Sequence, residues 1–387
     1  MRHIGVSVYG IRTPLIGRGD NLAAIAADSL CIALDAEGLT LKPSDIVGVT
    51  ESVVAKAQGN FAHLDDIAAD IRDKFADNTI GVVFPILSRN RFLNILKGIS
   101  LGAKRVCVLL QLPHDEVGNP IIDPELIDEL EGELTGLLPA TEFKRIAGGY
   151  KHPFTGVDYI ELYGQLSDNI DIYLSSDPRD ILKFTPHVLA AEIHGRMRTK
   201  ARLLKAGAET VYTLADILCE PRSDCGYNPD YGVLGSNLST DTELKLFPRD
   251  CGEFVTSLRA EIKARIGVAP EILIYGDGAF KDPFAGIWEL ADPVVSPGHT
   301  ARLSGQPNEI KLKLAADKFS SASHQETEAA ITKLIREKSA TEDFRDGTTP
   351  RKFADLLGSL CDLTSGSGDK GTPMVLVKGY FDDFASE

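Results

Sequence analysis

The residues best suited to chemistry lie in the segment 271–283, Glu-Ile-Leu-Ile-Tyr-Gly-Asp-Gly-Ala-Phe-Lys-Asp-Pro. An apolar, β-branched run ends here in small residues and in two carboxylates, Asp277 and Asp282. α/β enzymes present metal-binding oxygens in this way at the carboxyl end of a strand. Hard cations such as Mg²⁺ or Mn²⁺ prefer such ligands and use them to hold phosphate groups. Asp277 is therefore the first candidate catalytic residue, and the alternative is a polar turn in which Gly276 and Gly278 supply unusual dihedrals.

Composition and charge narrow the function classes. The chain has 387 residues, of which 43% are hydrophobic and 25% are charged, and this balance is typical of a globular protein with two or three domains. The formal net charge of −15 argues against a general binder of nucleic acids or membrane surfaces, which needs a surplus of Lys and Arg. The first residues indicate a strand instead of a signal peptide, and no apolar run is long enough to span a bilayer, so we expect a cytoplasmic protein.

The six cysteines give no sign of a metal or disulfide framework. They are widely spaced and include no Cys-x-x-Cys pair. Only Cys219, Cys225 and Cys251 lie near one another in the sequence, which leaves a metal role for these three as a minor alternative.

Apolar runs alternate with helical patterns along most of the chain, which predicts an α/β fold. Asp20 is the predicted N-cap of the first helix. Residues 219–239 contain several Pro and Gly residues and are predicted to be irregular, as functional segments commonly are. The predicted strands are 4–9, 45–50, 79–85, 105–112, 211–214, 271–275 and 373–378, and the predicted helices are 21–35, 91–101, 124–137, 186–206, 251–266 and 323–338.

One tempting motif fails in its context. Residues 366–371, Gly-Ser-Gly-Asp-Lys-Gly, fit the pattern G-x-G-x-x-G, but they precede a predicted strand. A dinucleotide-binding fingerprint follows a strand and opens a helix, so we interpret this segment as a flexible loop. The sequence contains no phosphate-loop motif, no H-E-x-x-H zinc motif and no G-x-S-x-G nucleophile motif.

Several short motifs together resemble the coenzyme F420-0:L-glutamate ligase (γ-glutamyl ligase) family. Residues 11–22 are similar to the family's opening "P-x-x-x-x-G-D-D/N-L", and residues 45–59 are similar to its "D-V-V-V-V-T-x-K-I-V-S-K-x-E-G". Residues 231–237, Tyr-Gly-Val-Leu-Gly-Ser-Asn, resemble its "A-G-V-D-x-S-N". The Asp277 segment falls where the family has "D-T-x-G-R", and residues 373–379 resemble its terminal "P-V-x-V-x-R-G".

The resemblance implies a two-domain γ-glutamyl-ligase-like fold of the α/β (mixed α+β) class with an inserted α/β segment. We therefore expect residues 1–77 and 198–387 to form the two parts of a ligase core, and residues 78–197 to form the insert. Three positions depart from the family pattern. Leu234 stands where the family has a metal-binding Asp, Gly278 replaces a metal-associated Thr, and Ser52 replaces a Lys.

The activity implied by this resemblance is GTP-dependent ligation of L-glutamate to the carboxylate of a phosphorylated cofactor, with Mg²⁺ or Mn²⁺, by a homodimer. Asp277 and Lys56 are the residues that would carry catalysis, with Asp277 as a metal ligand. Since Leu234 cannot bind a cation, the missing carboxylate would come from Asp230, Asp241, Asp250 or Asp282, of which Asp282 is the choice nearest to Asp277 in sequence. The residues that would lie along the nucleotide are Thr13, Pro14, Leu15, Ile16, Glu51, Lys56 and Asn237.

Basic residues concentrate in the segment 194–202, His-Gly-Arg-Met-Arg-Thr-Lys-Ala-Arg. Arg196 and Arg198 are the candidates for gripping a phosphate or carboxylate of the acceptor substrate, although a solvated helix surface is the commoner explanation for such a cluster. Lys56 also has an ordinary explanation, since its ammonium group could simply stay in water at a helix start. His152 could touch substrate, but an ordered turn is the preferred interpretation.

Three functions remain open from the sequence. The first is a metal- and nucleotide-dependent glutamate ligase that acts on F420-0, a folate or another carboxylate acceptor. The second is a phosphotransferase or phosphohydrolase that uses Asp277 and a metal without forming an amide. The third is a non-catalytic nucleotide-binding protein that kept the fold but lost the metal ligand at position 234, where Leu234 now stands.

Overall fold

The protein folds into two compact units. The first unit comprises Met1–Val54, Asp250–Gly278 and Val294–Glu387, and the second comprises Ala55–Arg249 and Ala279–Pro293. Their bounds differ from the three predicted segments, since the second unit takes residues from all of them. The computed structural model describes residues 4–75, 79–130, 132–222, 224–278, 280–281, 288–289, 291–318, 323–338, 344, 350–364, 366 and 368–386.

A five-stranded sheet forms the centre of the first unit. Its strand order is β1 (Ser7–Ile11), β16 (Met374–Lys378), β2 (Ile46–Thr50), β12 (Glu271–Tyr275) and β15 (Gly298–His299). β2 and β12 are parallel neighbours, and β16 runs antiparallel to both β1 and β2. β1, β2 and β12 therefore point in the same direction, and their carboxyl ends lie at one edge of the sheet.

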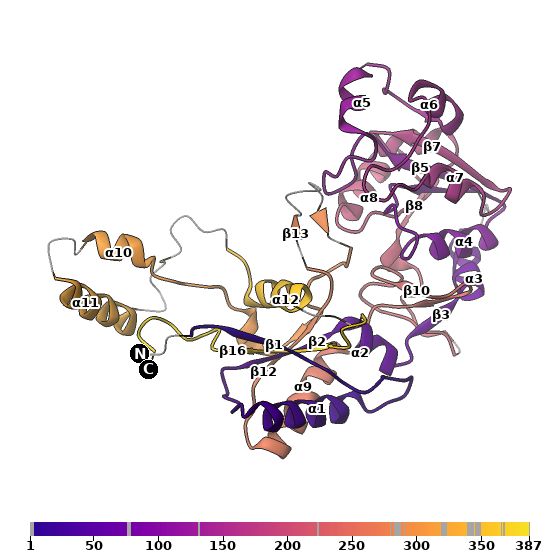
Figure 1. The fold of residues 1–387 in the computed structure, drawn as a ribbon. Coiled ribbons are helices and arrows are strands. Elements are labelled where there is room, and N and C mark those ends of the chain that lie inside the picture. Colours follow the sequence, from indigo (N-terminus) through magenta and orange to yellow (C-terminus); the bar gives the residue numbers. More distant parts are fainter. Residues whose placement is uncertain are drawn as a thin grey trace. The chain divides into compact units, whose positions relative to one another are not determined.

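Helices cover both faces of this sheet. α1 (Leu22–Glu37) and α9 (Cys251–Ile266) pack together on one face, and α12 (Phe353–Thr364) packs on the other, as Figure 1 shows. α10 (Leu312–Lys318), α11 (His324–Glu337) and the short 3-10 helix η3 (Ala301–Ser304) complete the described helices of this unit.

The first helix begins at Leu22, one residue later than predicted. The Asn21 side chain accepts a hydrogen bond from the backbone N–H of Ala24 at 3.2 Å, and this interaction caps α1. Asp20 instead accepts a hydrogen bond from the N–H of Gly17 at 2.6 Å, so it closes the preceding loop. The prediction that Asp20 caps the helix was wrong, because Asp and Asn serve equally well as caps and the sequence places them side by side.

A mostly parallel sheet forms the centre of the second unit. The strand order is β6 (Leu138–Pro139), β7 (Ile170–Ser175), β5 (Arg105–Gln111), β4 (Thr79–Val83), β8 (His187–Ala190) and β9 (Thr210–Thr213), and only β6 is antiparallel. A small antiparallel sheet joins β10 (Asn237–Thr240), β11 (Glu243–Lys245) and β3 (Phe61–His63).

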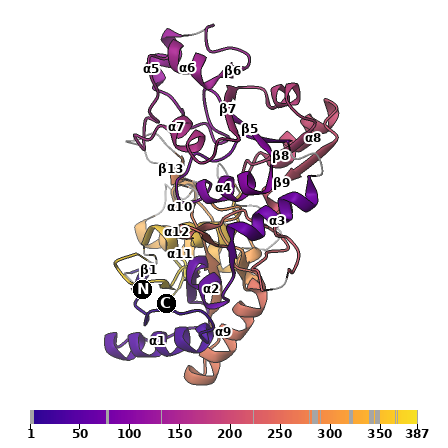
Figure 2. The ribbon, with the colours of Figure 1, turned by 90° about the vertical axis from the view of Figure 1, so that its right-hand side faces the viewer.

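Two separate apolar cores cover the two faces of the large sheet. One core packs α3 (Leu64–Lys74), α4 (Leu93–Gly102) and α7 (Tyr159–Gly164) against the sheet. The other packs η1 (Pro178–Lys183) and α8 (Arg196–Lys205) against the opposite face. Figure 2 shows α3 and α4 side by side, in agreement with their extensive contacts. The remaining described helices are α2 (Glu51–Ala57), which crosses the boundary between the units, α5 (Pro124–Glu129), α6 (Ala140–Ile146) and η2 (Leu214–Asp216).

The chain that follows the Asp277 segment is anchored in the second unit. β13 (Phe280–Lys281) and β14 (Trp288–Glu289) pair, and the backbone N–H of Trp288 donates to the Asn119 side chain at 2.7 Å. Farther along, Asp292 forms an ion pair with Arg91 at 2.6 Å, and both side chains are largely buried. These contacts explain why residues 279–293 belong to this unit.

The predicted helix 186–206 was wrong in its first half. Residues 187–190 form the buried strand β8, and the helix begins only at Arg196. The segment His-Val-Leu-Ala-Ala-Glu-Ile is apolar without a breaker, and a strand buried on both faces cannot be distinguished from a helix by periodicity alone. The predicted helix 124–137 is also shorter than expected, since α5 ends at Glu129.

The other main elements confirm an α/β, mixed α+β fold. The helix predicted at 251–266 and the strand predicted at 271–275 have the observed bounds of α9 and β12. α12 was not predicted, although its buried residues recur at helical spacing. Within the described residues, no helix is both long enough and apolar enough to cross a membrane.

Candidate functional site

The carboxyl edge of the first sheet gathers several of the predicted site residues. Thr50 at the end of β2 is paired with Tyr275 at the end of β12, so Glu51 and Gly276 leave the sheet side by side. Ile11 at the end of β1 is paired with Met374, which is paired in turn with Val49 of β2. The loops that follow β1, β2 and β12 therefore begin at the same edge, where ligands bind in open α/β sheets.

Two carboxylates occupy adjacent positions at this edge. Glu51 is the first residue of α2, directly after β2, and is only 4% exposed. Asp277 is the second residue after β12 and is partly exposed. The strand ends are held in place by the backbone N–H of Thr50, which donates to the carbonyl of Pro373 at 2.9 Å. The positions of both side chains are thus set by the parallel pairing of β2 and β12.

A third carboxylate lies at this edge. It was not among the predicted site residues. Asp362 of α12 accepts a hydrogen bond from the backbone N–H of Gly278 at 3.0 Å. A Cβ atom on Gly278 would lie 2.8 Å from the Cα atom of Ser359, which is too close for a side chain. α12 packs so closely against Gly278 that a threonine side chain, which the ligase family has at this position, would not fit. The buried positions of 353–364 recur at helical spacing, which predicts the helix that carries Asp362 but not its contact with Gly278.

We expect Gly278→Ala to destabilise the protein by about 1–3 kcal/mol, because either the Asp277 loop or the α12 backbone has to shift. Chemical denaturation measures this loss. Gly252→Ala in α9 is the matched control, since a Cβ atom there meets nothing within 4 Å and the change should be neutral or stabilising by up to about 1 kcal/mol. Equal stability of the two variants would contradict the close approach of α12.

The predicted nucleotide residues Thr13, Pro14, Leu15 and Ile16 also lie in the first unit, in the loop after β1. Ile16 is buried and anchors this loop, whereas the Leu15 side chain is 99% exposed. The Thr13 hydroxyl donates to the carbonyl of Pro14 at 2.9 Å. The structure therefore brings the Thr13 loop, Glu51 and Asp277 to the same edge of one sheet.

The remaining predicted nucleotide residues belong to the second unit. Lys56 is exposed and lies in the last turn of α2, a position that favours a cation in any helix. Asn237 begins β10 and is paired with Lys245 of β11. Leu234, which replaces the family's metal-binding Asp, is 1% exposed and packs within the larger core of this unit.

The donor chemistry at the first sheet's edge fits a hard cation in type. Glu51, Asp277 and Asp362 carry carboxylate groups there, and Mg²⁺ commonly uses only one or two carboxylates together with substrate phosphates and water. Among the described residues, no three His, Cys, Asp or Glu side chains are grouped closely enough to hold a metal by themselves. Asp282, the predicted second ligand, lies outside the described residues.

Of the other carboxylates considered as replacements for Leu234, Asp250 has the most suitable location. It precedes α9 with a φ angle of 53°, a left-handed conformation that is uncommon for residues other than glycine, although Asp adopts it more readily than most. The next residue, Cys251, packs against Gly298, which is paired with Ile274 near the end of β12. Asp230 and Asp241 are exposed residues of the second unit.

The predicted substrate residues lie in the first turn of α8. The Arg196 guanidinium donates to the carbonyl of Ile193, and Arg198 is exposed. Farther along the helix, Arg202 contacts Asp177 at 3.3 Å and Lys200 contacts Asp216 at 3.5 Å. Part of the basic cluster is therefore engaged in surface ion pairs.

Other sequence candidates have structural roles. His152 lies in an ordered turn, since its N–H donates to Val157 and its carbonyl accepts from Gly156, each at 2.9 Å. All six cysteines are free thiols, and burial raises the pKa of Cys225 to about 12. The turn that contains Asp369 and Lys370 precedes the strand β16, whereas a dinucleotide-binding motif would follow a strand.

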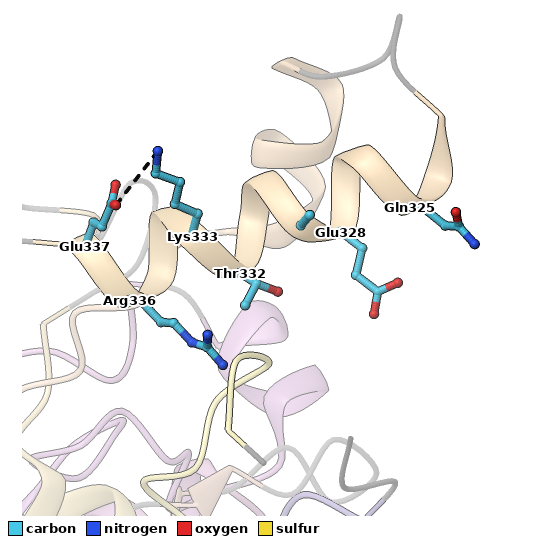
Figure 3. A pocket seen from close by; sticks show the side chains of 7 residues that line it. Gln325, Glu328, Thr332, Lys333, Arg336 and Glu337 are labelled. Carbon is cyan, nitrogen blue, oxygen red and sulfur yellow. Dashed lines mark ion pairs between the residues drawn. The ribbon is translucent and has the colours of Figure 1, made fainter.

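A surface groove in the first unit is separate from this edge. It has a volume of about 570 Å³ and follows one side of α11, as Figure 3 shows. None of the predicted site residues lines it. Its lining consists of Gln325, Glu328, Ala329, Thr332, Lys333, Arg336 and Glu337, all from the same helix.

The first unit carries Glu51 and Asp277 at the carboxyl ends of two adjacent parallel strands, which is where open α/β sheets bind their ligands. The chain matches the F420-0:Gamma-glutamyl ligase family over residues 10–379 and belongs to that family. This match confirms the resemblance found in the motifs and places the protein among ligases. No curated protein matches the chain significantly.

Proposed function

We propose that the protein is a GTP-dependent ligase that joins the amine of L-glutamate to a carboxylate of F420-0 or a related cofactor acceptor. The observation that carries this proposal is the gathering of the Thr13 loop, Glu51 and Asp277 at one sheet edge in a chain of the γ-glutamyl ligase family. The family membership supplies the reaction class, and the edge supplies groups suited to a metal-bound nucleotide.

The proposed reaction has two steps. A carboxylate oxygen of the acceptor attacks the γ-phosphorus of GTP, and GDP leaves with the electrons of the broken P–O bond. The resulting acyl phosphate is then attacked by the neutral amine of glutamate, which loses a proton as the amide forms and inorganic phosphate leaves. Positioning and charge neutralisation provide most of the catalysis in such phosphoryl transfers.

The roles of individual residues follow from their positions and from the resemblance. Asp277 would hold Mg²⁺ or Mn²⁺, which when bound neutralises charge on the phosphates. Glu51 and the Thr13 loop would lie along the nucleotide. The roles proposed for Lys56, as a phosphate-binding cation, and for Asn237 rest on the resemblance alone. We also propose a homodimer on that basis.

Arg196, near the end of the segment 78–197, and Arg198, directly after that segment, are proposed to bind the acceptor, and the segment is proposed to set the acceptor's identity. Changing both to Gln should raise the apparent KM for the acceptor about tenfold or more and leave the KM for GTP nearly unchanged. Steady-state kinetics with each substrate varied in turn measures the two constants. Arg145→Gln is the control, since its exposed side chain pairs only locally with Glu142. Equal changes in both KM values, or no change, would show that the pair is a solvated surface.

Phosphate release from GTP, measured with and without L-glutamate and acceptor, tests the proposal. A ligase releases phosphate only when both substrates are present, together with Mg²⁺ or Mn²⁺. Metal-dependent release of phosphate at the same rate with and without glutamate would instead identify a phosphohydrolase. Nucleotide binding without any release would favour the non-catalytic alternative, which the burial of Leu234 in an apolar core specifically suggests.

A further inference from the structure

The large sheet of the second unit contains a topological switch point between β4 and β8. The chain leaves β4 toward α4, whose Ile95 and Leu96 belong to the core on one face. It leaves β8 toward α8, whose Leu203 belongs to the core on the opposite face. The two connections diverge at the carboxyl ends of these adjacent parallel strands, and such switch points are where open α/β sheets bind ligands.

An anion-binding arrangement of backbone N–H groups lies at this place. The consecutive N–H groups of Ile193, His194 and Gly195 all point at the carboxylate of Glu116, and each donates to one of its oxygens at 2.7 Å. They precede the ten-residue helix α8, whose N-terminus adds a favourable potential for negative charge. Glu116 itself comes from the loop after β5, the neighbour of β4.

A second carboxyl group is buried directly beside these N–H groups. Glu192 is 2% exposed, and its Oε2 atom has no hydrogen-bond partner. Its Oε1 atom lies 2.9 Å from the position that a Cβ atom on Gly195 would take, so the carboxyl group lies against the start of α8. A buried carboxyl oxygen without a partner is uncommon in proteins and indicates a missing ligand group or water.

Burial and charge both act on the Glu192 carboxyl group. Burial raises the pKa of this carboxyl group above its usual range, and the nearby charge of Glu116 raises it further, while Thr199, Arg198 and Arg202 of α8 act in the opposite direction. The free Oε2 atom of Glu192 can complete its hydrogen bonding with an oxyanion through one shared proton.

A strained backbone conformation lies at the same switch point. Phe84, the first residue after β4, has a φ angle of 54°, which is unusual for an aromatic residue. Its N–H donates to the carbonyl of Leu109 in β5 at 2.8 Å, so neighbouring backbone holds the residue in this conformation. Strained residues of this kind are concentrated at ligand-binding and active sites.

We propose that the start of α8 binds an oxyanion of a small-molecule ligand, a phosphate or a carboxylate group, and that Glu116 occupies this site until the ligand displaces it. The N–H groups of Ile193, His194 and Gly195 hold the oxyanion, and a hydrogen bond with one shared proton links it to the Oε2 atom of Glu192. The inference does not depend on the ligase reaction, since the same contacts would serve any ligand that carries such a group.

The test follows backbone amide signals of the full-length, ¹⁵N-labelled protein by NMR during titration with inorganic phosphate, dimethyl phosphate or acetate. We expect saturable shifts at residues 193–195, and the three probes separate a phosphate monoester, a phosphodiester and a carboxylate as the preferred group. Glu116→Gln should bind the preferred probe about tenfold more tightly than the wild type, because the competing charge is gone. Glu142→Gln, which changes an exposed glutamate of the same unit, should bind like the wild type.

Changes at Glu192 test the second group. Glu192→Ala should weaken binding about tenfold, and Glu192→Gln should restore it, because the amide also donates a hydrogen bond. If Glu116→Gln does not fold, saturable shifts at residues 193–195 of the wild type still show whether the oxyanion binds there. Absence of such shifts at residues 193–195 with all three probes would overturn the proposal and leave Glu116 as a structural tie. That result would leave the ligase proposal standing, since no catalytic activity is measured.

Discussion

Asp277→Asn should abolish metal-dependent turnover while the protein remains folded. The substitution preserves the volume of the side chain but removes the negative charge that we propose holds Mg²⁺ or Mn²⁺. Asp277 is partly exposed in a loop after β12, so the change leaves the buried strand itself unaltered. Phosphate release at limiting metal, together with a thermal unfolding curve, measures both parts of this expectation.

Asp28→Asn is the matched control for Asp277→Asn. Asp28 lies on α1 of the same unit and is largely exposed, where it pairs with Arg265 at 2.7 Å. It should retain full activity, since exposed ion pairs contribute little to stability and Asp28 is remote in sequence from the strand ends. Wild-type activity of Asp277→Asn at limiting metal would show that Asp277 is not a metal ligand.

Lys56→Ala is expected to weaken nucleotide binding about tenfold to a hundredfold. Loss of one charge-assisted contact with a phosphate corresponds to about 1.5–3 kcal/mol. Titration with GTP in the presence of metal, followed by calorimetry, measures the change in Kd. Turnover should fall as well, because the same contact would neutralise charge during phosphoryl transfer.

A comparison with Lys104→Ala separates this effect from a general loss of positive charge. Lys104 is also an exposed lysine of the second unit, and it precedes β5. Its removal should leave the GTP titration unchanged. If the two variants bind GTP equally well, Lys56 is a solvated residue in the last turn of α2 and the proposed phosphate contact is absent.

Some elements could be predicted from the sequence because local signals and tertiary packing agree. α9 has helical spacing and ends at Ile266, where Gly267 caps it in a left-handed conformation, and β12 is an apolar β-branched run that is buried throughout. β8 was mistaken for a helix because a strand covered on both faces has no polar alternation. Only its pairing with β4 and β9 decides its conformation.

The two sites differ in how far the sequence could reveal them. Glu51 and Asp277 each follow a recognisable apolar strand, and parallel pairing then brings both to one edge. The contact between Glu116 and the start of α8 joins residues 77 to 79 positions apart through backbone N–H groups. Every residue type except proline has the same backbone N–H donor, so a side-chain motif cannot predict such a site.

Transfer of oxygen-18 from a labelled acceptor carboxylate tests the proposed reaction most directly. The acceptor, with oxygen-18 in its reacting carboxylate, is incubated with the protein, GTP, L-glutamate and Mg²⁺ or Mn²⁺, and both products are analysed by mass spectrometry. An acyl-phosphate route predicts one oxygen-18 atom in each inorganic phosphate released, in step with formation of the γ-glutamyl amide. Release of unlabelled phosphate without amide formation would contradict the account.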